Sequence, residues 1–172
     1  GLWLGPSAGG TPAAVTSPDY RAHVAHWSPD GTHIVFNRRP LDQGLAILPA
    51  AGGEPILLGA VARGGGGDWS PDGERIAFLG QTDAGNELFT IPATGGEPEQ
   101  LTHGAEIVDF FHDFDWSADG RTFVYASMAS GKRELWSVSA DGTDRNQVSA
   151  MEGLVSEPAL SPDGRRIVHC AQ

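Results

Sequence analysis

Short apolar runs recur along the chain, and each lies beside a tight-turn sequence. The runs cover residues 33–37, 75–79, 122–126 and 166–170 and are rich in Ile, Val and Phe. Apolar runs of this length between turn residues predict β-strands, because a helix needs a longer window with a 3.6-residue period. Gly or Pro interrupts every longer window, so we expect helix to be nearly absent.

One five-residue sequence precedes each run. Trp27-Ser28-Pro29-Asp30-Gly31 recurs as Trp69-Ser70-Pro71-Asp72-Gly73, as Trp116-Ser117-Ala118-Asp119-Gly120 and as Leu160-Ser161-Pro162-Asp163-Gly164. The copies begin 42, 47 and 44 residues apart, near the period of about 40–45 residues of a propeller blade. Pro presets φ at the first corner of a turn, and Asp and Gly suit the later corners. The Asp and Gly of each copy are therefore predicted to build hairpin turns.

A second turn signal repeats out of phase with the first. Strands that open at Leu2, Leu45, Leu88 and Leu135 run into Gly9-Gly10, Gly52-Gly53, Gly95-Gly96 and Asp141-Gly142. Each unit then has an innermost strand ending at the Trp or Leu, a strand after Asp-Gly, a third at the Leu and a short outer strand. This pattern predicts an all-β protein, a β-propeller of four-stranded antiparallel blades.

These motifs resemble the TolB-like, or PD40, repeat, which is related to the WD40 blade. The best match is the second unit, which also has Gly95-Gly96-Glu97-Pro98 and Leu101-Thr102; the third has Ala118 for Pro and the fourth Leu160 for Trp. The resemblance implies a scaffold like those of translocation-envelope proteins, regions beside serine peptidase domains and sensor regions of membrane proteins. It also implies an extracytoplasmic or periplasmic location, although the chain shows no signal peptide.

The unit boundaries predict three whole blades and one blade split between the ends of the chain. The whole blades cover 17–59, 60–102 and 103–149; residues 1–16 form the two outer strands of the split blade and 150–172 its two inner strands. The ends could pair within one chain as a four-bladed ring, or the chain could be a segment of a longer propeller. We favour a homodimer in which two chains exchange half-blades and form an eight-bladed ring.

Charge and cysteine content narrow the range of partners. The chain has 11 Lys and Arg against 22 Asp and Glu, a formal net charge of −11. Such a surface repels phosphate backbones and anionic headgroups, so we expect neither nucleic acid nor membrane insertion. Cys170 is the only cysteine and cannot form a disulfide within the chain.

The sequence contains one match to a catalytic motif, and its context does not fit that motif. Gly5-Pro6-Ser7-Ala8-Gly9 matches the G-x-S-x-G pattern, but that nucleophile elbow requires a strand-turn-helix context. Ser7 instead aligns with Ala50, Ala93 and Ala140 in the second turn of each unit. We therefore predict no catalytic residue, and we expect no cofactor.

The residues before each Trp motif are predicted to lie near the central channel, because they belong to the innermost strand. They are His23, His26, Asp68, Asp109, His112, Asp113, Asp115 and Glu157. Four of them are candidate ligands for a divalent metal, namely His23, His26, His112 and Asp115. Related propellers, the oligogalacturonate lyases, hold a metal on channel histidines. The competing interpretation, which we favour, is that these side chains form hydrogen bonds between blades.

Two functions follow from these alternatives. The first is a non-catalytic scaffold that presents loops and a channel to a protein, peptide or small ligand, and it is the function we predict. The second is a metal-dependent, lyase-like enzyme with its site in the channel. A third possibility is a propeller fragment, natural or made to study assembly, with no function of its own.

Overall fold

The computed structural model describes residues 1–17, 21–38, 44–58, 65–105, 107, 114–149 and 155–171. Within these ranges the chain is all β, with no helix. The described part consequently contains no helix that is long and apolar enough to cross a bilayer. The expected all-β fold class is confirmed.

Three antiparallel sheets of four strands form the body of the molecule, and in each the strands neighbour one another in chain order. The first sheet comprises β3 (Ala22–Trp27), β4 (His33–Arg38), β5 (Leu45–Pro49) and β6 (Ile56–Leu57). The second comprises β7 (Gly65–Trp69), β8 (Arg75–Thr82), β9 (Gly85–Pro92) and β10 (Glu99–Gln100). The third comprises β11 (Phe114–Trp116), β12 (Thr122–Ser127), β13 (Glu134–Ser139) and β14 (Asn146–Ser149). We call them the first, second and third blades.

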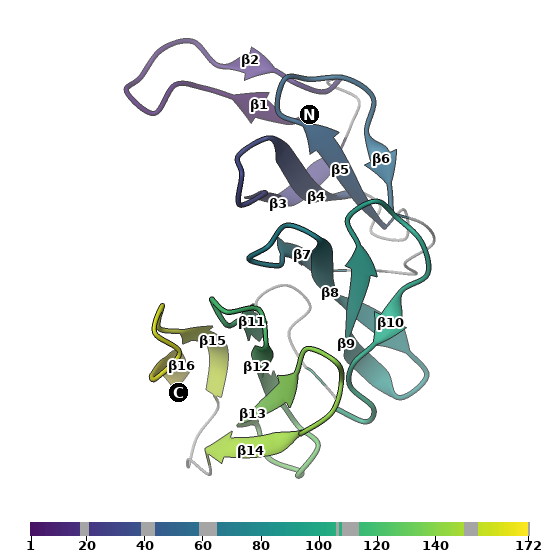
Figure 1. The fold of residues 1–172 in the computed structure, drawn as a ribbon, viewed down its shortest axis with the longest axis vertical. Helices are drawn as coiled ribbons and strands as arrows, with labels where there is room; N and C mark the ends of the chain where they lie inside the picture. The colour runs from purple at the N-terminus through teal and green to yellow at the C-terminus, as the bar shows by residue number, and fades with distance from the viewer. Residues whose placement is uncertain are drawn as a thin grey trace.

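Two smaller sheets flank the three blades. They are β1 (Trp3–Leu4) with β2 (Ala13–Ala14), and β15 (Val155–Leu160) with β16 (Ile167–Ala171). Figure 1 shows all five sheets along an open arc, with β1–β2 at one end and β15–β16 at the other. Within the described ranges no ladder joins β1 to β16. The two halves of the predicted split blade are therefore separate in this structure.

The core lies between the blades. Ile76 and Phe78 of β8 pack on one side with Val35 and Leu45 of the first blade. Ala77 and Leu79 of the same strand pack on the other side with side chains of the third blade, which include Trp116, Phe123 and Tyr125. A strand buried on both faces has no polar side to alternate with, and this explains the continuous apolar runs in the sequence.

The Ser-Pro-Asp-Gly turn holds itself together with local hydrogen bonds. In the second blade, Ser70 Oγ donates to Asp72 Oδ1 at 2.5 Å, and the same oxygen accepts from the amide of Glu74 at 2.9 Å. Ser70 Oγ also accepts from the amide of Arg75 at 2.9 Å. Gly73 has φ +74°, a left-handed conformation in which a side chain is strained. The same bonds recur in the other three copies.

Replacing Asp72 with alanine is expected to lower the free energy of unfolding by about 1–3 kcal/mol, because the Ser70 hydroxyl and the Glu74 amide lose their acceptor. Gly73→Ala should lower it by about 1 kcal/mol through backbone strain. Urea denaturation measures both changes. Glu74→Ala is the matched control, since it alters the same turn without removing the acceptor. Equal stability of all three variants and the parent chain would contradict the assigned role of the turn.

Candidate functional site

The candidate site is a small pocket where the innermost strands meet, which we call the inner pocket. His26, Asp68, Asp115 and Ala159 line it, and they are the residues immediately before the Trp or Leu of the four turn motifs. They come from β3, β7, β11 and β15, which lie along the inner side of the arc (Figure 1). The pocket has a volume of about 160 Å³. The repeat therefore places one equivalent position from each unit around a shared space.

A β-bulge in the innermost strand precedes this position. The ladder shifts between His23 and Ala25, between Gly65 and Asp68, and between Ser156 and Ala159. At each bulge one residue has positive φ: Val24 at 47°, Gly66 at 59° and Glu157 at 51°. A bulge increases the local twist and redirects the side chains that follow it. Val24 is strained here, because a β-branched side chain strongly disfavours this region.

Two of the polar side chains in the pocket interact directly. His26 Nδ1 lies 3.6 Å from Asp68 Oδ1, and both side chains are partly exposed. Asp68 Oδ1 also accepts a hydrogen bond from the amide of Trp69 at 2.8 Å. This pair joins the first blade to the second at the inner edge. The indole Nε1 of Trp69 strengthens the joint by donating to the carbonyl of His26 at 3.3 Å.

Asp115 joins the third blade to the sheet that follows. Its Oδ2 accepts a hydrogen bond from the amide of Leu160 in β15 at 2.6 Å. Burial raises the pKa of Asp115, the amides of Leu160 and Trp116 oppose that rise, and the charge of Asp68 adds to it. Asp115 thus lines the pocket and forms a hydrogen bond between two neighbouring sheets.

The structure brings together only part of the predicted metal set. His26 and Asp115 line the pocket, with Asp68, which the predicted set did not include. His23 is exposed at the bulge of β3 and does not line the pocket. His112 lies outside the described residues. Among the residues that are described, no three His, Cys, Asp or Glu side chains are placed to hold one metal ion. The metal site remains a prediction.

Ser7 lies in a turn between two strands. The amide of Gly9 donates to the carbonyl of Pro6 at 3.0 Å, and the turn connects β1 to β2. This strand-turn-strand context differs from the strand-turn-helix context that a nucleophile elbow requires.

Sequence reasoning missed Glu87, a fully buried carboxylate between the second and third blades. Its Oε2 accepts from the Thr102 hydroxyl at 2.6 Å, and its Oε1 accepts from the Ala105 amide at 3.0 Å. The carbonyl of Ala105 in turn accepts from the Ser127 hydroxyl of β12. Glu87 thereby fixes the segment that connects the two blades. The available signal was the Glu-Leu pair, which recurs as Glu134-Leu135.

The family is decided by a match to the TolB β-propeller domain, PD40, over residues 60–172, which is more than half of the chain. The chain belongs to the TolB β-propeller family. The resemblance seen in the turn motifs is therefore confirmed. Comparison of the chain with the curated proteins gave no match.

Solved structures show the same fold at low sequence identity. The putative TolB from Agrobacterium tumefaciens is 21% identical, with a TM-score of 0.66 over 94% of this chain and 74% of that one. TolB from Acinetobacter baumannii is 16% identical, with a TM-score of 0.79 over 99% and 42%. An oligogalacturonate lyase in complex with manganese is 14% identical, with a TM-score of 0.75 over 93% and 47%. The chain thus spans less than half the length of the last two proteins.

Proposed function

We propose that this chain is a non-catalytic binding module that presents its loops, its inner pocket and the grooves between its blades to a protein, peptide or small ligand. The observation that supports this proposal most directly is how the polar groups of the inner pocket are used. Asp115 is bonded to the backbone of the next sheet, and Asp68 to a backbone amide and to His26. These carboxylates therefore take part in contacts between neighbouring blades. By family resemblance, we place the module outside the cytoplasm.

The second candidate function is a metal-dependent, lyase-like enzyme. It is favoured by His26, Asp68 and Asp115 lining one pocket, since imidazole and carboxylate oxygens are common ligands of divalent metals. The likeness to the manganese-bound lyase concerns the fold alone. A fragment without independent function remains the third alternative.

Two substitutions in the inner pocket separate the first two functions. Asp115→Ala is expected to lower the free energy of unfolding by about 2 kcal/mol, because the half-buried Leu160 amide loses a charged acceptor. His26→Ala should change it by less than about 1 kcal/mol, since its partner Asp68 is partly exposed. Thermal melts with and without manganese chloride are the measurement, together with the metal content of the purified protein.

The binding-module proposal predicts that manganese leaves the melting temperature of the parent chain unchanged. A ligand that binds only the folded chain must raise that temperature. An increase that His26→Ala abolishes, with about one metal bound per chain, would favour the enzyme instead. His103→Ala is the matched control, because His103 is an exposed histidine outside the pocket.

The partner we propose for the open ends of the arc is a second copy of the chain. Trp3 on β1 and Val168 on β16 are 60% and 69% exposed, the two highest values among the large apolar side chains of the described residues. In an eight-bladed ring, β16 of one chain would pair with β1 of the other and cover both side chains. Each blade would then have four strands, as the three whole blades do.

A further inference from the structure

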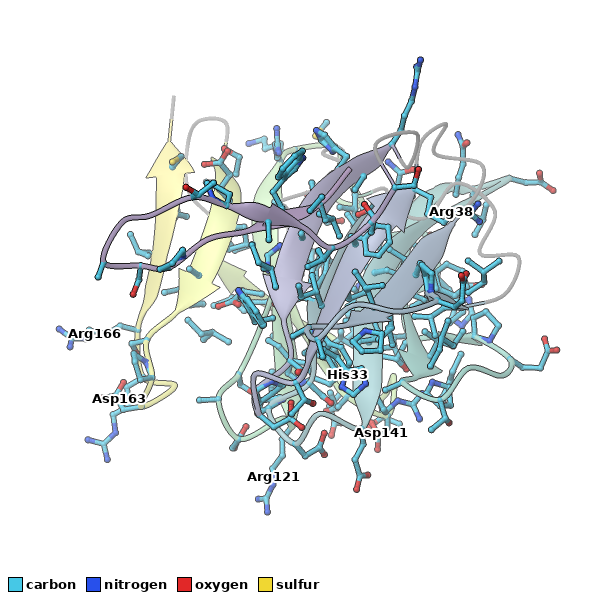
Figure 2. All side chains as sticks on the ribbon, turned by 90° about the horizontal axis from the view of Figure 1, so that it is seen from above. His33, Arg38, Arg121, Asp141, Asp163 and Arg166 are labelled. Atoms are coloured by element: carbon cyan, nitrogen blue, oxygen red, sulfur yellow. The ribbon has the colours of Figure 1, made fainter. Side chains whose placement is uncertain are left out.

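A groove separates the first and second blades at the end of the molecule where the Ser-Pro-Asp-Gly turns lie. It has a volume of about 360 Å³ and combines side chains from both blades. In Figure 2 its rim residue His33 lies at the same end as Arg121 and Asp141, and Arg38 lies at the opposite end. We call it the first inter-blade groove. It is distinct from the inner pocket and shares no lining residue with it.

Two aromatic rings form one side of the groove. The ring centroids of His33 and Trp69 are 6.4 Å apart, with their planes inclined at 46°. The indole is held by its bond to the His26 carbonyl, and the Thr32 hydroxyl lies 2.7 Å from Nδ1 of His33. Trp69 is only 8% exposed and packs in the core between the first two blades, whereas His33 is partly exposed. A flat or cationic group that enters the groove would therefore meet the ring of His33 and the uncovered edge of Trp69, both already fixed in place.

Two carboxylates stand at the rim. Asp30 and Asp72 both line the groove. Hydrogen bonds from Ser28 and Thr32, with the charge of His33 as the smallest contribution, lower the pKa of Asp30 to about 2. The bonds from Ser70 and Glu74 likewise lower the pKa of Asp72. Both groups are therefore ionised near neutral pH.

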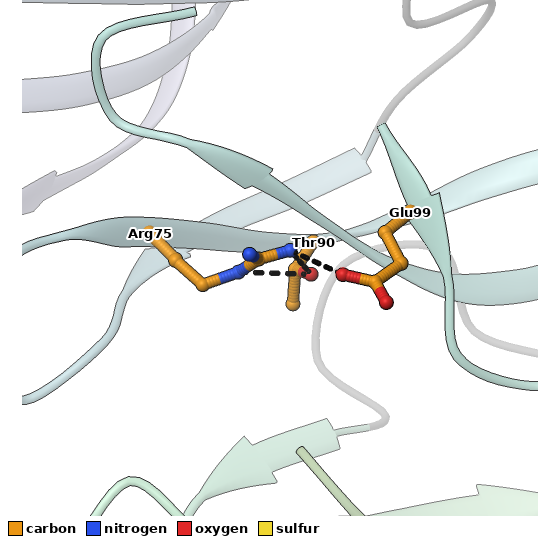
Figure 3. A network of polar contacts seen from close by, with 3 residues as sticks. All are labelled: Arg75, Thr90 and Glu99. Carbon is orange, nitrogen blue, oxygen red and sulfur yellow. Dashed lines mark hydrogen bonds and ion pairs between the residues drawn. The ribbon is translucent and has the colours of Figure 1, made fainter. Parts of the chain in front are cut away.

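Arg75, whose charge acts on Asp72, is held by other partners. Figure 3 shows the guanidinium of Arg75 bonded to the Thr90 hydroxyl and to Glu99, whose Oε2 lies 2.8 Å from Nη2. Among the effects that lower the pKa of Asp72, the charge of Arg75 is the smallest. None of the described residues that line the groove is a Lys or an Arg. The groove therefore carries negative charge without a cation of its own.

The floor of the groove is apolar and partly uncovered. Ile47 and Ile56 of the first blade face Ala93 of the second across it. Ile56 is 46% exposed, on the short strand β6. A ligand that fits this lining has a positive charge, a flat face for the rings and an aliphatic stem for the isoleucine. Arginine has all three, because its guanidinium is planar, stacks on aromatic faces and pairs with carboxylates.

The chain contains a second groove that serves as an internal comparison. It lies between the third blade and β15–β16, has a volume of about 280 Å³, and has Asp119 and Asp163 at the equivalent rim positions. Leu160 stands where the first groove has Trp69, and Thr122 stands where it has His33. The carboxylates thus belong to the turn of every blade, whereas the aromatic wall distinguishes the first groove.

We propose that the first inter-blade groove binds an arginine side chain of a peptide or protein partner. The guanidinium lies against His33 and the uncovered edge of Trp69, between the two carboxylates, and its methylene groups cover Ile56. This inference deepens the proposed binding function and assigns it a ligand. Failure of the arginine proposal is distinguishable from failure of the binding function. A module that binds through its inner pocket or other loops would keep that function without any dependence on arginine.

The experiment titrates the full chain with the blocked tripeptide acetyl-Gly-Arg-Gly-amide and follows its amide and indole resonances by NMR. The uncharged counterpart, with citrulline in place of arginine, is titrated in parallel. We expect arginine to bind at least about 10-fold more tightly than citrulline, with the Trp69 indole resonance shifted. Raising the salt concentration from about 0.05 to 0.5 M should weaken the arginine complex, because the ion pairs are near the surface.

Two variants of β6 provide the decisive comparison. Ile56→Lys places a cation in the groove and should reduce arginine binding at least about 10-fold. Leu57→Lys adds the same charge to the neighbouring residue, which is 53% exposed and does not line the groove, and it should preserve binding. Both positions are exposed, so both variants are expected to fold. Equal binding of arginine and citrulline, equal effects of the two lysines, or no binding at millimolar peptide would each overturn the proposal.

Discussion

Trp3→Asp and Val168→Asp are each expected to leave the chain folded and to prevent two chains from forming a ring. Both side chains are largely exposed in the single chain, so a carboxylate there costs little by itself. In the ring Val168 would be buried, as its counterpart Val124 in the third blade is here, and Trp3 would be partly buried, as its counterparts Phe89 and Trp136 are. A carboxylate forced into that interface loses its hydration, and we expect the dimer Kd to rise at least about 100-fold. Sedimentation velocity at micromolar concentration measures the change.

The matched control is Val148→Asp. Val148 is also a large exposed apolar residue, 45% exposed, but it lies on the outer strand β14, away from the open ends of the arc. This variant should dimerise like the parent chain. Deleting residues 1–16 should abolish dimerisation and also expose the cluster around Phe36, which Leu2 and Val15 help to cover. A parent chain that sediments as a compact monomer would exclude the homodimer and favour closure within one chain or within a longer propeller.

A cross-link can test the strand pairing itself. In the second blade Leu79 lies opposite Leu88, and the equivalent pair in the ring is Cys170 of one chain with Leu2 of the other. Leu2 and Leu88 both direct their backbone groups toward the outer strand. Their side-chain pairs are consequently of the closely spaced, non-hydrogen-bonded kind. With an added oxidant, Leu2→Cys should therefore form a disulfide between chains, which a non-reducing gel would display as a dimer.

Glu87→Ala is expected to cause the largest loss of stability among single substitutions outside the apolar core, about 3 kcal/mol. It removes the acceptor of the buried Thr102 hydroxyl and of the Ala105 amide, and each unpaired group has a desolvation cost. It also leaves a small cavity between the second and third blades. Urea denaturation monitored by tryptophan fluorescence measures the change.

Glu87→Gln is the matched control, since its side-chain oxygen can still accept the Ala105 hydrogen bond. We expect it to lose about 1 kcal/mol. Glu134→Ala offers a second comparison at the equivalent position of the third blade, where the carboxylate bonds only to the Ser130 hydroxyl among the contacts described. If Glu87→Ala were no less stable than Glu134→Ala, the connection between blades would not depend on this carboxylate.

The turns and the blade period could be predicted because their causes are local. Six consecutive residues, such as Ser70 to Arg75, contain the hydrogen bonds and the left-handed glycine that the turn requires, so a local sequence motif is enough to predict it. The apolar runs between them also follow from one rule, since a strand packed between two blades is buried on both faces.

The inner pocket was harder to predict because its shape depends on β-bulges, and a different type of residue occupies each bulge. Val24, Gly66 and Glu157 occupy the same left-handed bulge in three sheets, and nothing in these letters signals it. That bulge determines which side chains reach the pocket, so His26 and Asp68 meet there while His23 does not. The hydrogen bonds of Glu87 could not be predicted for another reason. Their donors, Thr102 and Ala105, lie 15 and 18 residues away in the chain.

The strictly sequential order of strands within each blade has a consequence for synthesis. Because β3, β4, β5 and β6 pair only with their neighbours in the chain, the first blade can complete its ladders as soon as its own residues leave the ribosome. Its side toward β7 stays uncovered until the second blade follows, some tens of residues later at about 5–20 residues per second. Each blade therefore spends a few seconds as the exposed end of a growing arc. During that interval, chaperones would encounter the same apolar surface that the next blade later covers.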